Sequence, residues 1–175
     1  MRVLAVAVAA GLLATPLLAQ GPAAPDLNDA EVAHVAVTAN AIDIELARFA
    51  QSRARNAEVR AFANTMISDH TAVNERAGAL AARLGVTPRD NQVSQSLQSG
   101  ARDARGSLER LRGSAFDRGY MDREVAYHQA VLDAIDGLLI PTTENGELRS
   151  LLSEVRPAIA AHLEHARRLR SSLGS

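Results

Sequence analysis

The sequence predicts an all-α protein built as a four-helix bundle. Apolar residues recur every three or four positions over four long stretches, which is the period of an amphipathic helix, and no segment alternates apolar and polar residues as a strand would. Aromatic residues make up only 3% of the 175-residue chain and Trp is absent, whereas Ala is frequent. The core is therefore expected to consist of closely packed aliphatic helices.

The N-terminal sequence MRVLAVAVAAGLLATPLLA, residues 1–19, has the composition of a cleaved secretory signal peptide. Residues 20–28 form a Pro- and Ala-rich linker, and residues 29–173 are expected to form one domain, since a mature chain of about 155 residues normally has a single core. An uncleaved membrane anchor is less favoured because no second apolar span follows. The protein is therefore expected in the periplasm or outside the cell, without a transmembrane span after cleavage.

Charge, cysteine content and motifs exclude several functions. The formal net charge of -1 offers no positive surface for nucleic acid. The absence of Cys excludes disulfides and a lipid anchor on a processed cysteine. No nucleophile stands beside a base, and there is no Gly-rich phosphate loop and no HExxH motif, so hydrolase and nucleotide-binding functions have no support.

The first two helices are expected to form an antiparallel hairpin. The first begins after Asn28, which forms a capping box with Glu31, and reaches to about Ala54. The second begins after a cap at Asn56 and stops at Gly85. The short turn between them places the two helices side by side.

The second half of the chain predicts another hairpin, reached through a long connection. Residues 89–113 contain three glycines and few apolar residues, and are expected to be a partly helical crossover. The third helix is expected over 114–139 and the fourth over 144–173, with a kink at Pro157. Two helical hairpins joined by one long crossover have the connectivity of a ferritin-like four-helix bundle.

Polar residues interrupt the apolar stripes of all four helices at one depth. His128 and His162 lie at the centres of the third and fourth stripes, and His70 flanks the second. Counted from the expected helix starts, these histidines and Asp43 of the first helix lie about 14 to 17 residues in. They should therefore share one level of the bundle, because each is near the middle of its own helix.

Three further carboxylates border this level: Asp69, Glu45 and Glu124. Asp69 stands beside the histidine of the second helix, and Glu45 flanks the first stripe together with Asp43. Glu124, one turn before His128, is expected as a ligand or as a residue that orients one. Two further polar residues are predicted to lie away from this level. His165 is expected near the surface, and Asp117 is expected as a cap at the start of the third helix.

This collection of side chains favours a metal site. An unpaired imidazole or carboxylate in an aliphatic core costs several kcal/mol, and a divalent cation removes that cost. Histidines with carboxylates suit Zn, Fe, Cu or Mn, with Zn and Fe as the main candidates. The competing interpretation is a closed hydrogen-bonded network of the histidines with Asp43, Asp69 and Glu124.

Four segments carry a family resemblance: DIELARFA, NAEVRAFANTMISDHT, LRGSAFDRGYMDREVAYHQAV and VRPAIAAHLEHA. In order and spacing, from about residue 29 to 170, they resemble the bacterial exported proteins catalogued as domain of unknown function family 4142, a ferritin-like group of the outer membrane or periplasm. The resemblance implies an envelope location and a ferritin-like bundle, and it names no biochemical role. Where that family usually has Glu in the first helix this chain has Asp43, so Glu45 is a second candidate for that ligand position.

Three functions are compatible with these observations. The leading one is an exported ferritin-like protein that binds, stores or buffers a metal ion and is not expected to be an enzyme. The second is a metal-free envelope interaction or stress-related module. The third and weakest is an iron- or peroxide-handling enzyme, because the Glu-x-x-His pattern of di-iron bundles is missing: Ile67, Val125 and Ile159 stand three residues before the histidines. The Ala-rich helices also leave a homodimer open.

Overall fold

The computed structural model describes residues 25–174, and this part of the chain is helical without a strand. The predicted signal peptide and residues 20–24 of the predicted linker lie outside the described residues. The elements are α1 (Asp29–Arg53), α2 (Ala57–Leu84), α3 (Gln92–Glu109), α4 (Gly113–Ala134), the π-helix η1 (Ile135–Leu139), α5 (Ile140–Thr142) and α6 (Gly146–Ser172). The all-α class is confirmed.

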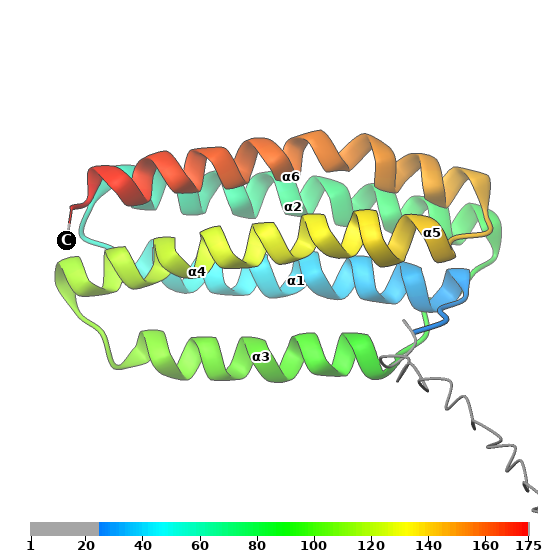
Figure 1. Ribbon diagram of the computed structural model, residues 1–175, viewed down its shortest axis with the longest axis horizontal. Coiled ribbons are helices and arrows are strands. Elements are labelled where there is room, and N and C mark those ends of the chain that lie inside the picture. The colour runs from blue at the N-terminus through cyan, green and yellow to red at the C-terminus, as the bar shows by residue number, and fades with distance from the viewer. Residues whose placement is uncertain (1–24, 175) are drawn as a thin grey trace, which may run out of the picture.

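The four long helices α1, α2, α4 and α6 form the bundle, and α3 runs along its side against α1 and α4 (Figure 1). Helix α2 is antiparallel to α1, and α6 is antiparallel to α4. Because α3 carries the chain back along the whole length of the bundle, α4 starts at the same end as α2. Two hairpins joined by one crossover are the predicted connectivity.

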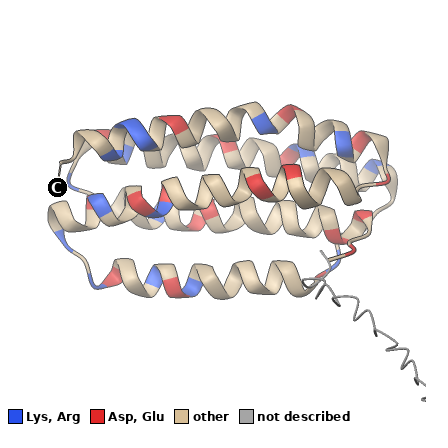
Figure 2. Cartoon of the chain, in the orientation of Figure 1, with Lys and Arg blue, Asp and Glu red and all other residues tan. Residues whose placement is uncertain are grey.

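Charged residues of both signs are interspersed along the helices (Figure 2). Among the described helices, none combines the length and the apolar character that crossing a membrane would require. Each described long helix thus carries residues of both charge signs.

The predicted caps of the first hairpin are confirmed. Asn28 Oδ1 accepts from the backbone N–H of Glu31, and Glu31 Oε2 accepts from that of Asn28, both at 3.1 Å. The Asn56 side chain accepts from two backbone N–H groups at the start of α2. Gly85 ends α2 at a φ of 65°, a left-handed conformation that glycine adopts without steric cost.

The crossover is partly helical, as predicted, and its helix α3 forms because packing compensates for the weak sequence pattern. Asn91 and Ser94 form a capping box at its start. Leu97 and Ala101 pack against the core and Leu108 is buried in it, whereas Gly100 faces open space. Burial of this one apolar side stabilises a helix whose local propensity is poor.

The turn between the two helices of the second hairpin also differs from the prediction. The chain stays helical past 139, through a π-helical turn whose Ile135 and Leu139 are buried, to Thr142. Asp29 of α1 then accepts from the backbone N–H groups of Glu144 and Asn145, at 2.9 and 3.0 Å. This contact fixes the loop before α6 to the first hairpin.

The sequence predicted that Asp117 caps the start of its own helix, and this prediction is wrong. Arg112 holds the N-cap position of α4, and its side chain makes no capping hydrogen bond. The buried Asp117 carboxylate instead reaches the turn between α1 and α2, where it accepts from the backbone N–H of Arg55 at 3.0 Å and of Asn56 at 2.9 Å. Asp117 therefore ties the two hairpins together at this end of the bundle.

We expect Asp117→Ala to lower the free energy of unfolding by about 2 kcal/mol, because two backbone donors lose a charged acceptor. The measurement is the urea midpoint at unchanged m-value. Asp122→Ala is the matched control on the same helix, since Asp122 is an exposed partner of Arg170 and should change the midpoint little. Equal midpoints for the two variants would contradict the structural role of Asp117.

The apolar core is divided into two clusters along the bundle axis. One cluster, near the turn between α1 and α2, contains Phe62, Met66 and Phe116. The other, toward the opposite end, contains Val32 and Leu152 among others. The polar side chains described next lie between these two clusters.

Candidate metal centre

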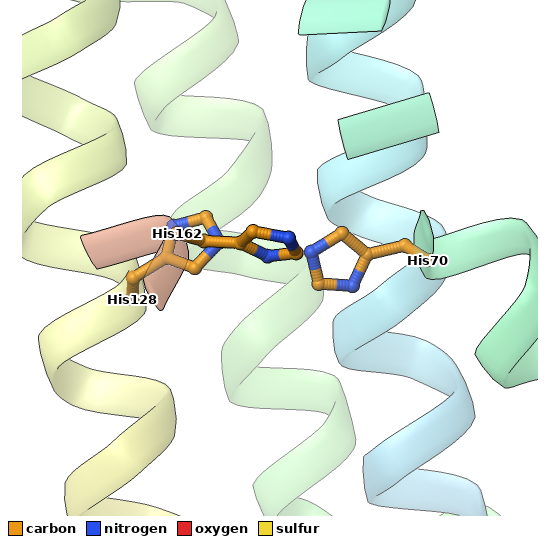
Figure 3. Close-up of side chains that lie close together, drawn as sticks. All are labelled: His70, His128 and His162. Carbon is orange, nitrogen blue, oxygen red and sulfur yellow. The ribbon is translucent and has the colours of Figure 1, made fainter. Parts of the chain in front are cut away.

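Three buried histidines from three helices meet in the middle of the bundle (Figure 3). His70 of α2, His128 of α4 and His162 of α6 are 3%, 1% and 8% exposed. Their ring centroids are 5.4 to 5.7 Å apart. One ring nitrogen from each lies within 4.8 Å of the others. The structure thus brings together, at one level, the three histidines that the sequence singled out.

His70, His128 and His162 form a histidine triad. Each imidazole of this triad has one ring nitrogen in contact with an oxygen acceptor from another residue. The three contacts are His70 Nδ1 to Asn40 Oδ1 at 2.7 Å, His128 Nδ1 to the Glu124 backbone oxygen at 3.0 Å, and His162 Nε2 to Asp69 Oδ2 at 3.0 Å. An oxygen acceptor places the ring proton on the contacting nitrogen, so a neutral ring carries its lone pair on the other one.

Those other nitrogens are His70 Nε2, His128 Nε2 and His162 Nδ1. All three are buried and lack a hydrogen-bond partner. Buried polar atoms normally have at least one partner, so a group of three without any requires an explanation. Metal-ligating histidines show this arrangement, with one ring N–H donated to an oxygen and the other nitrogen free to bind the ion.

Asp43 of α1 adds a carboxylate to the triad. Its side chain is fully buried, and Oδ2 lies 3.0 Å from His70 Nε2 and 4.0 Å from His128 Nε2. The closer contact is not aligned as a hydrogen bond, and Oδ2 has no other partner. Burial raises the pKa of Asp43, but the contacts with His70 and Arg123 outweigh it and hold this pKa well below its usual range. An ionised oxygen therefore faces His70 Nε2 and His128 Nε2.

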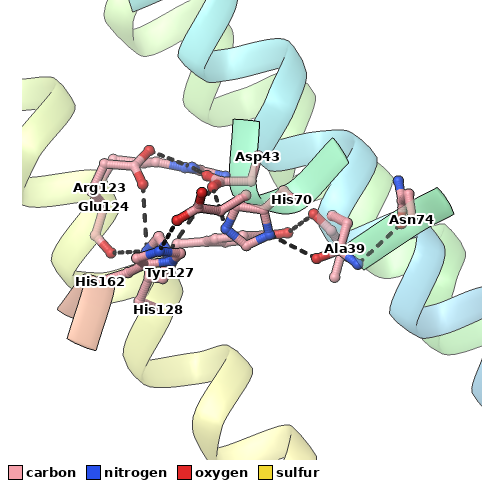
Figure 4. Close-up of polar contacts among 11 residues, drawn as sticks. Ala39, Asp43, His70, Asn74, Arg123, Glu124, Tyr127, His128 and His162 are labelled. Atoms are coloured by element: carbon pink, nitrogen blue, oxygen red, sulfur yellow. Dashed lines mark hydrogen bonds and ion pairs between the residues drawn. The ribbon is translucent and has the colours of Figure 1, made fainter. Parts of the chain in front are cut away.

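Arg123 and Glu124 complete the buried cluster (Figure 4). The guanidinium Nη1 donates to Asp43 Oδ1 at 2.8 Å and to Glu124 Oε1 at 2.7 Å. Glu124 is fully buried, and its other oxygen Oε2 lies 3.4 Å from His128 Nδ1 without a hydrogen bond. The Arg123 guanidinium also stacks on the Tyr127 ring, 3.9 Å from its centroid. The carboxylates are thus held by a buried cation of the protein itself.

Burial also sets the charge of the remaining groups. It lowers the pKa of His128 to about 4, which leaves this imidazole neutral at neutral pH, and it lowers the pKa of His162 as well. Burial raises the pKa of Glu124, and the neighbouring ionised Asp43 raises it further, to about 8. Neutral imidazoles are the form that a metal ion binds.

Two of the predicted carboxylates lie away from the centre of the triad. Glu45 is on the surface, with a side chain 75% exposed and 3.7 Å from Arg105, so it does not take the position suggested for it. Asp69 is half-exposed and contacts the outer nitrogen of His162, where it orients the ring. His165 is exposed, as expected, and packs edge-on against Phe62.

Arg123 and Asn40 belong to the cluster, and sequence reasoning did not include them. Arg123 stands four residues before Tyr127, a spacing that places both on one helix face. Asn40 stands three residues before Asp43 on the buried face of α1, and its amide N–H donates to Asn74 Oδ1 at 3.0 Å, which leaves Oδ1 for His70. These helical spacings were the available signals.

The buried neutral imidazole predicts a pH dependence of stability. The pKa of His128 falls from its ordinary 6.5 to about 4 on folding, so between these values the unfolded chain binds more protons. Lowering the pH through this window should therefore cost the metal-free protein stability, on the order of 3 kcal/mol from this residue. His128→Leu removes the contribution.

The measurement is urea unfolding of both proteins in chelator from pH 7 to pH 4. The variant should gain stability relative to the wild type as the pH falls. The raised pKa of Glu124 acts in the opposite direction, but Glu124 is present in both proteins and its effect largely cancels in the difference. A difference that does not change with pH would contradict a neutral buried His128.

The comparisons with known proteins give one result for the whole chain. Neither the curated proteins nor the solved structures contain a match. A family model described as Domain of unknown function (DUF4142) matches residues 14–169, which includes all four bundle helices almost completely and every member of the buried cluster. The chain belongs to the DUF4142 family of domains of unknown function.

Proposed function

We propose that this protein binds one divalent transition-metal ion, Zn or Fe, at the centre of its bundle. His70, His128 and His162 would be the nitrogen ligands, and Asp43 the carboxylate ligand. The observation that carries the proposal is the set of three buried imidazole nitrogens that face one another without a hydrogen-bond partner. Three histidines with one carboxylate are a donor set that these metals accept.

A metal-free hydrogen-bonded network explains this centre less well. In such a network donors and acceptors alternate, and every buried polar atom has a partner. Here the outer contacts use the ring N–H groups, so the three nitrogens and Asp43 Oδ2 are four acceptors with no donor between them. A cation would give all four acceptor atoms the positively charged partner that they lack.

We further propose that the protein stores or buffers the ion in the cell envelope and is not an enzyme. The predicted signal peptide supports this location. His162 and Asp69 form the side of the centre nearest to solvent, with side chains 10% and 48% exposed, whereas Asp43 is fully buried. Exchange of the ion would pass this side, and a closed set of four ligands leaves no open position for a substrate.

Elemental analysis tests the proposal. The mature wild-type protein, purified from a periplasm without chelators, should contain close to one transition-metal ion per chain. His128→Ala should contain less than about a tenth of that amount, because it loses the most deeply buried of the three histidine ligands. His165→Ala is the matched control, since this histidine is exposed on α6 and should leave the metal content unchanged.

The result that would overturn the proposal is a wild-type protein without metal that also takes up none on reconstitution. Such a protein would be the metal-free interaction module. Equal loss of metal in His128→Ala and in His165→Ala would also contradict the assigned ligands.

A further inference from the structure

We infer that Arg123 fills a second cation position beside the histidine triad and thereby restricts the centre to one metal ion. The inference rests on the proposed function, since it concerns how many ions the same centre accepts. The role assigned to the buried guanidinium is to limit the number of ions, which is separate from binding the ion and from packing the helices.

The second position is formed by Asp43, Glu124 and His128. One ligand atom from each of these buried residues lies within 4.8 Å of the others. Two carboxylates and an imidazole are a donor set for a divalent cation. This group shares His128 with the triad, so with an ion on the triad the two carboxyl groups are the donors left to the second position. Asp43 faces both positions, so the two are adjacent (Figure 4).

The Arg123 guanidinium already takes the place of a cation in this group. Its Nη1 lies 2.8 Å from Asp43 Oδ1 and 2.7 Å from Glu124 Oε1, and so bridges the two carboxylates. Each carboxylate thus uses one oxygen for Arg123 and leaves the other, Asp43 Oδ2 or Glu124 Oε2, without a hydrogen bond. The cation of the protein stands where a second metal ion would bridge the same residues.

The Arg123 side chain is held in this position by Tyr127. Tyr127 lies under the guanidinium, and its hydroxyl donates to the backbone oxygen of Ala39 at 2.8 Å, which anchors the ring to α1. The Arg123 side chain is only 11% exposed, whereas Arg156 in a surface ion pair is 45% exposed. Leaving this position would separate a buried cation from the buried carboxylate of Asp43 and from its hydrogen bond to Glu124, which is strongly unfavourable.

Charge balance then limits the number of ions. One divalent ion in the triad together with the guanidinium carries three positive charges, and the carboxyl groups of Asp43, Glu124 and Asp69 can supply at most three negative charges. A second divalent ion next to Arg123 would add two positive charges to a buried region with no further carboxylate to offset them. A second ion therefore enters only when the guanidinium is removed.

The test is the number of Co²⁺ ions bound by wild type, Arg123→Met and Arg123→Lys, measured by calorimetric titration and by elemental analysis after free ion is removed. Methionine keeps much of the apolar stem without the charge, and lysine keeps the charge. We expect one ion in the wild type, two in Arg123→Met and one in Arg123→Lys.

The outcomes separate the two proposals. No ion in the wild type would overturn the proposed function itself. One ion in the wild type and still one in Arg123→Met, or two in the wild type, would overturn the role of Arg123 and leave the triad in place. Arg123→Met should be less stable than the wild type in chelator and regain stability when Co²⁺ is added. A variant that gains no stability with Co²⁺ would also contradict the inference, because a cation that replaces the guanidinium must stabilise the fold.

Discussion

Saturating the wild-type protein with its metal should raise the free energy of unfolding by about 4 kcal/mol when free ion is about a thousand times the dissociation constant. For a chain of this size that corresponds to an increase of roughly 10 °C in melting temperature. The increase is expected because the three histidines come from α2, α4 and α6 and meet only in the folded state. Unfolding separates them and releases the ion.

The measurement is thermal unfolding with and without Zn²⁺, followed by addition of a chelator, which should return the melting temperature to its metal-free value. His162→Ala should show almost no increase with Zn²⁺. His165→Ala, three residues along the same helix and exposed, should respond as the wild type does. A wild-type melting temperature that is the same with metal and with chelator would favour the metal-free interaction module.

The parts of the fold that could be predicted are those set by local sequence. The capping box at Asn28, the cap at Asn56 and the stop at Gly85 each depend on a few neighbouring residues, and the structure confirms all three. The helicity of α3 depends instead on burial of Leu97 and Leu108 against helices distant in sequence. Residues 89–113 carry only a sparse apolar stripe that includes Leu97 and Leu108, so the sequence predicts a partly helical crossover but not the helices against which it packs.

The same distinction applies to the candidate centre. The level of the three histidines follows from helix geometry, because a residue in the middle of each helix lies in the middle of the bundle. Asp43 and Glu45 are two residues apart, about 200° around the helix, so only one of them can face the core. Packing places Asp43 inside.

Arg123 was not included because its sequence position indicates a charged helix flank, and charged side chains are usually exposed there. Its long side chain reaches back to Asp43 on α1 and covers the Tyr127 ring, and both contacts depend on how α1 and α4 pack. The spacing between Arg123 and Tyr127 could be seen in the sequence. The contact with Asp43 could not be predicted, because it depends on the long reach of the arginine side chain to another helix.

Asp43→Ala should have the largest effect on stability, lowering the free energy of unfolding of the metal-free protein by about 3 to 5 kcal/mol. Removing one partner of a buried ion pair leaves the other charge without full compensation. Asp43 is fully buried and pairs with Arg123, which then keeps only Glu124. The measurement is urea unfolding in chelator, so that loss of metal does not contribute. Glu45→Ala, on the same helix and exposed, is the matched control and should change stability little.

A double-mutant cycle identifies which contact of Asp43 is responsible. If the ion pair with Arg123 dominates, the double variant Asp43→Ala with Arg123→Met should be more stable than the sum of the two single losses predicts, by about 1 to 3 kcal/mol. That gain is expected because the double variant no longer contains a buried guanidinium with too few carboxylates. Additive losses would mean that Asp43 contributes to stability independently of Arg123. In that case the guanidinium would not be the cation that holds Asp43 in place, and Arg123 would not fill the second cation position.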